Sequence, residues 1–78
     1  MMRTVTVFTR PGCHLCDDAI ATVEHVRERV PFVLTLVDIE ADETLHLRYL
    51  ERIPVVAVDG RELFEFFVDA DALADALG

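Results

Sequence analysis

The 78-residue chain is predicted to fold as a single α/β domain with the element order β-α-β-α-β-β-α. A strand-helix-strand pattern opens the chain and implies two parallel strands joined by a right-handed crossover. Asp59-Gly60 lies between two apolar runs and favours a β-hairpin. An apolar pattern with helical spacing closes the chain. Together these features predict a four-stranded mixed sheet with helices on both faces, formed by residues 1–78.

The first strand is predicted at residues 3–9, where polar and apolar side chains alternate and β-branched residues are frequent. Pro11-Gly12 interrupts this pattern. A helix is then predicted over residues 13–29, because its apolar side chains recur at intervals of three and four. These side chains are Leu15, Ala19, Val23, Val26 and Val30.

The middle of the chain predicts a second strand and a second helix. Residues 32–38 form a nearly continuous apolar run, which is typical of a strand buried on both faces. Asp42 is a candidate N-cap for a helix over residues 43–51. Ile53-Pro54 then interrupts the chain before a short apolar strand at residues 55–58.

The end of the chain predicts a returning strand at residues 61–68 and a helix that Asp69 or Asp71 caps. Phe64, Phe66 and Phe67 cannot all lie on one face of that strand, since side chains alternate. We expect these aromatic side chains to contribute to the core rather than to a partner surface.

The charge balance argues against several classes of partner. The chain has 15 acidic and 7 basic residues, a formal net charge of −8, and such a surface repels nucleic-acid phosphates. No apolar run approaches the roughly 20 residues that span a bilayer. The first residues lack the apolar segment and cleavage site of a signal peptide. We therefore expect a cytoplasmic protein, a monomer, that binds neither nucleic acid nor membrane.

The two cysteines, Cys13 and Cys16, are the strongest functional signal. In a reducing compartment such a pair is more typical of catalysis or metal binding than of a structural disulfide. Cys13 falls at the start of the predicted helix, where free backbone N–H groups and the helix dipole stabilise a thiolate. Only the thiolate attacks a disulfide. We therefore expect Cys13 to be the nucleophile and Cys16, one turn deeper, to resolve the mixed disulfide.

Other uses of the cysteine pair stay open. Tetrahedral zinc needs four ligands and this pair supplies two, although two chains together can share an iron–sulfur cluster. The alternatives are thus an iron–sulfur or metal carrier, or a redox-inactive adaptor with the same fold. Our main prediction is an enzyme without a bound metal or cofactor.

Two charged residues beside the cysteines are candidate binding residues. We expect Arg10 and Arg52 near the rim of the site. An arginine there can bind a carboxylate of a substrate or a thiol cofactor. His14 follows Cys13 directly and can stabilise its thiolate, which would make the couple more oxidising.

Four segments carry a resemblance to a known family. They are VFTRPGCHLC at residues 7–16, VDIE at 37–40, YLERIPVV at 49–56 and VDG at 58–60. Through them almost the whole chain resembles a small bacterial glutaredoxin-like protein of the thioredoxin superfamily. The resemblance implies a thioredoxin-like fold and a thiol–disulfide oxidoreductase activity that transfers electrons through a redox-active Cys13–Cys16 disulfide.

The resemblance also implies roles for two further residues. The proline that opens the third strand of this superfamily is cis and faces the cysteines, which corresponds to Pro54 here. The peptide group of Ile53 would then pair with an extended substrate or a thiol cofactor. Together with Arg10 and His14, these two residues complete the predicted substrate-binding set.

The resemblance does not indicate the electron donor. Glutaredoxins carry a Gly-Gly pair before the last helix that contacts glutathione, and this chain has LFEFF at residues 63–67. Glutathione, another low-molecular-weight thiol and a flavoprotein reductase are the candidate donors. The expected partners are proteins with disulfides, or mixed disulfides of small thiols.

Overall fold

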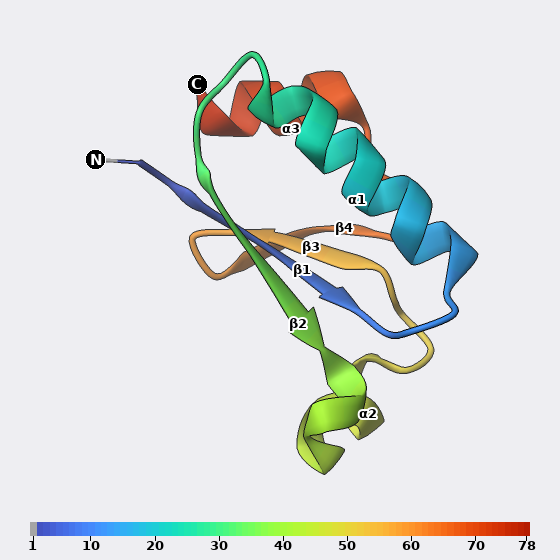
Figure 1. Cartoon of the computed structure of the whole chain (residues 1–78). Helices are drawn as coiled ribbons and strands as arrows, with labels where there is room; N and C mark the ends of the chain where they lie inside the picture. Colours follow the sequence, from blue (N-terminus) through green and yellow to red (C-terminus); the bar gives the residue numbers. More distant parts are fainter. Residues whose placement is uncertain (1) are drawn as a thin grey trace.

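The computed structural model describes residues 2–78, and its helices and strands follow the predicted order (Figure 1). A short 3₁₀ helix, η1, is the one element that the sequence patterns did not predict. The elements are β1 (Thr4–Thr9), α1 (His14–Arg27), β2 (Val33–Asp38), η1 (Ile39–Ala41), α2 (Glu43–Tyr49), β3 (Val55–Val58), β4 (Arg61–Glu65) and α3 (Ala70–Leu77).

The four strands form one mixed sheet in the order β2-β1-β3-β4. β1 pairs with β2 in parallel and with β3 in the antiparallel direction. β3 and β4 form the predicted hairpin, in which Asp59 has a φ of 50° and Gly60 a φ of 85°. Two successive residues with positive φ are the signature of the tight turn that matches the twist of a hairpin.

The main core lies between the sheet and the two helices α1 and α3, which pack side by side on one face (Figure 1). Val5 and Val7 on β1 point toward these helices and are fully buried. Because side chains alternate along a strand, Phe8 points to the opposite face. The buried members of this cluster are Val5, Val7, Val23, Val26, Phe32, Val56, Val58, Leu73 and Leu77.

A smaller core lies on the opposite face, at the end of the sheet where β1 finishes. There the ring of Phe8 stacks on Tyr49 of α2, with 4.3 Å between the ring centroids. Helices therefore lie on both faces of the sheet, as predicted. The buried members of this second cluster are Cys16, Ile39, Tyr49, Ile53 and Val55. It is this cluster that holds one of the two cysteines.

The expectation that residues 32–38 form a strand buried on both faces is wrong. β2 is an edge strand, and Val33 and Leu36 are 48% and 51% exposed. The two side chains point to opposite faces and are exposed for different reasons. Val33 lies on the face of α2, whose seven residues cover only one end of the sheet. Leu36 lies beside Val7 on the face of α1 and α3, at the edge of the sheet. An apolar run alone does not reveal that its strand lies at an edge.

The returning strand is also shorter than predicted and ends at Glu65. Phe66 adopts a left-handed backbone conformation with a φ of 66°, which ends the β-ladder. Of the three aromatic residues, only Phe64 packs against the core, while Phe66 and Phe67 are 41% and 74% exposed. Assigning all three to the core was therefore wrong for two of them.

The helix ends agree better with the sequence. Asp42 and Asp69 are the N-caps of α2 and α3, and each carboxylate accepts two backbone N–H hydrogen bonds.

Within residues 2–78, no helix combines the length and the apolar character that crossing a membrane requires.

Candidate active site

The two cysteines lie where β1 leads into α1, and they form a disulfide with 5.2 Å between their Cα atoms. The chain reverses direction at Pro11-Gly12, where Gly12 has a φ of 78° that glycine adopts without steric cost. Cys13 follows as the N-cap of α1 with an extended backbone. The local sequence thus delivers Cys13 to the helix tip and Cys16 into its first turn.

The two sulfur atoms have different surroundings. Cys16 is fully buried, whereas Cys13 is partly exposed, so an incoming reagent reaches the sulfur of Cys13 first. The Cys13 Sγ accepts a hydrogen bond of 3.2 Å from the backbone N–H of Cys16. After reduction the same N–H and the helix dipole would favour negative charge on Cys13.

The loop before β3 forms the other wall of the site. The Ile53–Pro54 peptide bond is cis, and both residues are buried. Ile53 belongs to the same cluster as Cys16, and Cys13 packs against that cluster. The structure therefore brings Cys13, Cys16 and Ile53 together, although Cys13 and Ile53 lie far apart in the chain.

The backbone groups of this loop are partly occupied. The N–H of Ile53 donates to the carbonyl of Tyr49 at 3.0 Å, and the carbonyl of Pro54 accepts from the N–H of Phe66 at 2.9 Å. Because the N–H of Ile53 is already bonded, its carbonyl is the group that would pair with an extended substrate. Its predicted role in substrate binding, like that of Pro54, stays a prediction.

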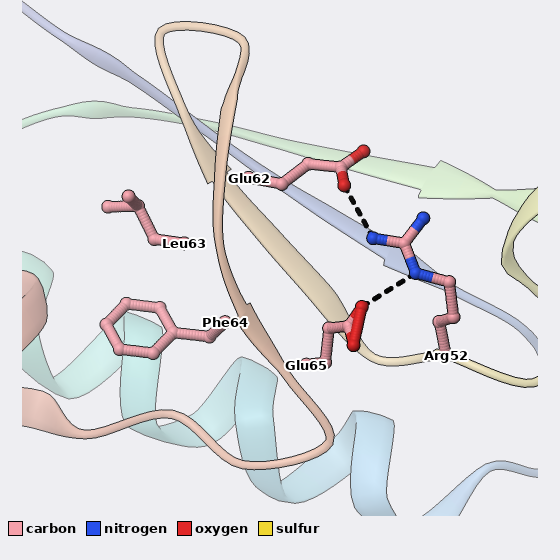
Figure 2. Close-up of a pocket in the computed structure, with 5 residues that line it drawn as sticks. All are labelled: Arg52, Glu62, Leu63, Phe64 and Glu65. Atoms are coloured by element: carbon pink, nitrogen blue, oxygen red, sulfur yellow. Dashed lines mark hydrogen bonds and ion pairs between the residues drawn. The ribbon is translucent and has the colours of Figure 1, made fainter.

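A polar network fixes this loop to β4 (Figure 2). Arg52 donates to Glu62 at 2.6 Å and to Glu65 at 2.7 Å, and Glu62 also accepts from the Tyr49 hydroxyl at 2.7 Å. Hydrogen bonds from Arg52 and then Tyr49 hold the pKa of Glu62 below its usual range. Burial, followed by the bond to Glu62, raises the pKa of the Tyr49 phenol, so this phenol stays protonated at neutral pH.

Sequence reasoning missed Glu62 and Glu65. Residues three apart on a regular strand point to opposite faces, so nothing in the pattern suggests that one arginine binds both. A β-bulge next to Leu63 shifts the register: Phe64 pairs with Val56, but Glu62 pairs with Ala57. With this bulge both carboxylates lie on the side of Arg52 and bind it. The guanidinium that we expected to bind a substrate carboxylate is therefore already bound within the protein.

Arg10 and His14 are placed differently. The Nε of Arg10 lies 3.7 Å from a carboxylate oxygen of Glu40, and both side chains are about two-fifths exposed. His14 is the first residue of α1 and is exposed. Arg10 precedes Cys13 by three residues and His14 follows it directly, and both side chains are accessible. Their predicted roles in binding are compatible with this geometry.

The described residues offer no further metal ligands beside the cysteine pair. Among residues 2–78, no group of three or more His, Cys, Asp or Glu side chains is arranged to hold a metal ion.

Residues 4–78 match the family model described as a glutaredoxin-like domain (DUF836). The chain belongs to this family. The match extends over nearly the whole of the chain, which confirms the resemblance inferred from its motifs. No curated protein shows a significant match.

Solved structures place this glutaredoxin-like domain among proteins of similar size. Protein Ne2328 from Nitrosomonas europaea is 31% identical, with a TM-score of 0.86 over 100% of this chain and 94% of that one. Protein XcR50 from X. campestris is 34% identical, with a TM-score of 0.78 over 94% and 93% of the two chains.

A thioredoxin from Halobacterium salinarum shares the fold at a TM-score of 0.69. It is 24% identical over 96% of this chain and 71% of that one. The predicted thioredoxin-like fold is therefore confirmed for this glutaredoxin-like domain.

Proposed function

We propose that this glutaredoxin-like domain is a thiol–disulfide oxidoreductase that cycles between a Cys13–Cys16 disulfide and a dithiol. The observation that carries the proposal is the asymmetry of the pair. Cys13 lies accessible at the tip of α1 with a backbone N–H directed at its sulfur, and Cys16 lies buried within disulfide reach. Family membership supports the same chemistry.

The reaction starts from the reduced protein. The Cys13 thiolate attacks one sulfur of a substrate disulfide, forms a mixed disulfide and releases the other substrate sulfur as a thiolate. Cys16 then loses its proton and attacks the Cys13 sulfur. This step forms the Cys13–Cys16 disulfide and releases the second substrate sulfur, so two electrons pass to the substrate.

A donor returns two electrons to complete the cycle. Glutathione, another low-molecular-weight thiol or a flavoprotein reductase can supply them, and the first two would attack Cys13 as thiolates. The substrates we propose are protein disulfides and mixed disulfides of small thiols. We place the cycle in the cytoplasm, in a monomer, with Arg10, His14, Ile53 and Pro54 contacting the substrate.

The test reduces the oxidised protein with each candidate donor in turn. The reduced Cys16→Ser variant, freed of donor, is then mixed with a disulfide substrate. This variant should accumulate a mixed disulfide on Cys13, detected by mass spectrometry as the added mass of the substrate thiol. The Cys13→Ser variant should form none.

Two results would contradict the proposal. One is a Cys13→Ser variant that reduces insulin as fast as the unmodified protein. The other is anaerobically purified protein that carries zinc or an iron–sulfur chromophore on the cysteines and forms no reversible disulfide.

A further inference from the structure

Phe66 and Phe67 are aromatic residues that the fold leaves outside its core. They are 41% and 74% exposed, and Phe66 has a φ of 66°. Residues other than glycine rarely adopt this region of backbone space, and a bulky residue such as phenylalanine is an outlier there. The N–H of Phe67 donates to the carbonyl of Glu65 at 2.7 Å, which closes a tight turn. Such a conformation at an exposed apolar site favours a functional reason for it.

The turn lies beside the cysteine pair. The N–H of Phe66 donates to the carbonyl of Pro54, the residue after Ile53 in the wall of the site. On its other side the turn meets α1 and leaves a hollow of about 90 Å³ lined by Phe66, Phe67, Val68, Asp18, Ala19 and Thr22. The hollow thus begins within two residues of Cys16.

One face of α1 extends this apolar surface toward the disulfide. Leu15 precedes Asp18 and Ala19 by three and four residues, so all three lie on the same side of the helix. Leu15 lies between the two cysteines in the sequence and is 37% exposed. We name Leu15, Phe66, Phe67 and the hollow the Phe67 surface.

The border of the Phe67 surface is acidic. Asp18 lines the hollow, and Asp69 and Asp71 follow the two phenylalanines in the chain. Glu65, which precedes Phe66, is already paired with Arg52 and is not part of this rim. An apolar centre with a carboxylate rim complements an apolar side chain that has cationic neighbours.

We propose that the Phe67 surface docks protein substrates in which an apolar side chain near the disulfide is flanked by lysine or arginine. The proposal rests on the thiol–disulfide exchange proposed above and names its class of substrate. A second copy of the same acidic chain fits the surface poorly, because the carboxylate rims would repel each other.

The kinetic test uses short peptides with one cysteine carried as a mixed disulfide with thionitrobenzoate. The Cys13 thiolate attacks the peptide sulfur, thionitrobenzoate leaves and is followed by its absorbance, and Cys16 then releases the peptide thiol. One peptide has leucine between two lysines, the second has leucine between two glutamates, and the third has serine between two lysines. A small symmetric disulfide reports the exchange without docking.

The assay follows a single turnover of the reduced protein, so no electron donor is needed. We expect the second-order rate constant at low salt to be about tenfold higher for the lysine–leucine peptide than for either other peptide. Phe67→Ser should slow that peptide about tenfold more than it slows the small disulfide. Asp18→Asn should reduce the preference for lysine over glutamate, and salt should do the same. Leu47→Ser is the matched control, because Leu47 is an exposed apolar residue on α2, at 77%, outside the Phe67 surface.

A binding measurement keeps docking separate from catalysis. Cysteine-free versions of the peptides, labelled with a fluorophore, are titrated with the oxidised protein and followed by anisotropy. If the small disulfide is not reduced but the lysine–leucine peptide binds and Phe67→Ser weakens it, the proposed function fails and the docking proposal stands. Equal binding of all three peptides would overturn the docking proposal. So would a concentration-dependent dimer that Phe67→Ser dissociates, because the surface would then bind a second copy.

Discussion

At the scale of single residues, Tyr49 links the core of the site to its polar wall. Its ring stacks on Phe8 in the cluster that contains Cys16, and its hydroxyl donates to Glu62. The guanidinium carbons of Arg48 and Arg52 lie 5.4 and 5.2 Å from its ring centroid, within cation–π distance. One buried phenol therefore ties α2, the loop before β3 and β4 together.

We predict that Tyr49→Phe lowers the free energy of unfolding by about 1.5 kcal/mol, because the substitution removes one hydrogen bond to a charged acceptor and keeps the stacked ring. Urea unfolding followed by circular dichroism measures this change. The control is the Tyr49→Phe, Glu62→Gln double variant. Strict additivity of the two single effects would show that the hydroxyl and the carboxylate do not interact.

The cysteine pair is the residue-scale feature that the sequence predicted best. Its signal is local, since the strand pattern, Pro11-Gly12 and the helical spacing after Cys13 are adjacent in the chain. The structure confirms a partly exposed Cys13 and a buried Cys16. The binding of Arg52 by Glu62 and Glu65 was not predictable, because it depends on a bulge and on the distance between two loops.

At the scale of elements, the β3–β4 hairpin depends on its turn. Gly60 has a φ of 85°, and a Cβ atom placed on it would meet nothing within 4 Å. The cost of a side chain at this position is therefore conformational rather than steric contact with another part of the chain.

We predict that Gly60→Ala destabilises the protein by about 1 kcal/mol, the usual cost of a left-handed backbone for a residue with a Cβ. Gly60→Asn is the matched control and should lose less, because asparagine tolerates this conformation better. Thermal unfolding compares the two variants. Equal losses for alanine and asparagine would contradict the explanation.

The sequence-based predictions were wrong where the burial or the length of a strand depends on neighbouring elements. Residues 32–38 have the apolar composition of a buried strand, but the order β2-β1-β3-β4 places them at an edge. The strand at residues 61–68 stops at Glu65 because Phe66 turns out of the ladder. Neither the strand order nor the left-handed backbone of an aromatic residue has a local signature in the sequence. Helix caps do have one: Asp42 was predicted as a cap, and Asp69 was one of the two candidates for α3.

At the scale of the whole molecule, acidic residues dominate the surface, and two of them anchor distant segments. Asp59, in the hairpin turn, accepts hydrogen bonds from the backbone of Thr4 and from Arg3, so it ties the start of β1 to the β3–β4 turn. The bond from Thr4, more than the charge of Arg3, holds the pKa of Asp59 below its usual range. Hydrogen bonds from Arg52 and then Tyr49 likewise hold the pKa of Glu62 below its usual range.

These two lowered pKa values predict that the protein loses stability in acid. A carboxylate with a lower pKa in the folded state adds stability above its unfolded pKa, about 4, and this stability is lost as the pH falls through the folded pKa. Urea unfolding between pH 7 and pH 2.5 should show the decline. Asp59→Asn and Glu62→Gln should flatten it, whereas Asp75→Asn, an exposed control on α3, should not.

The most direct test of the central claim is a redox titration of the Cys13–Cys16 pair. The protein is equilibrated in thiol–disulfide buffers of known potential, quenched with an alkylating reagent and weighed by mass spectrometry. We predict one reversible two-electron transition between about −320 and −200 mV, the range in which cytosolic thiols exchange electrons. The absence of a reversible Cys13–Cys16 disulfide across this range would contradict the account.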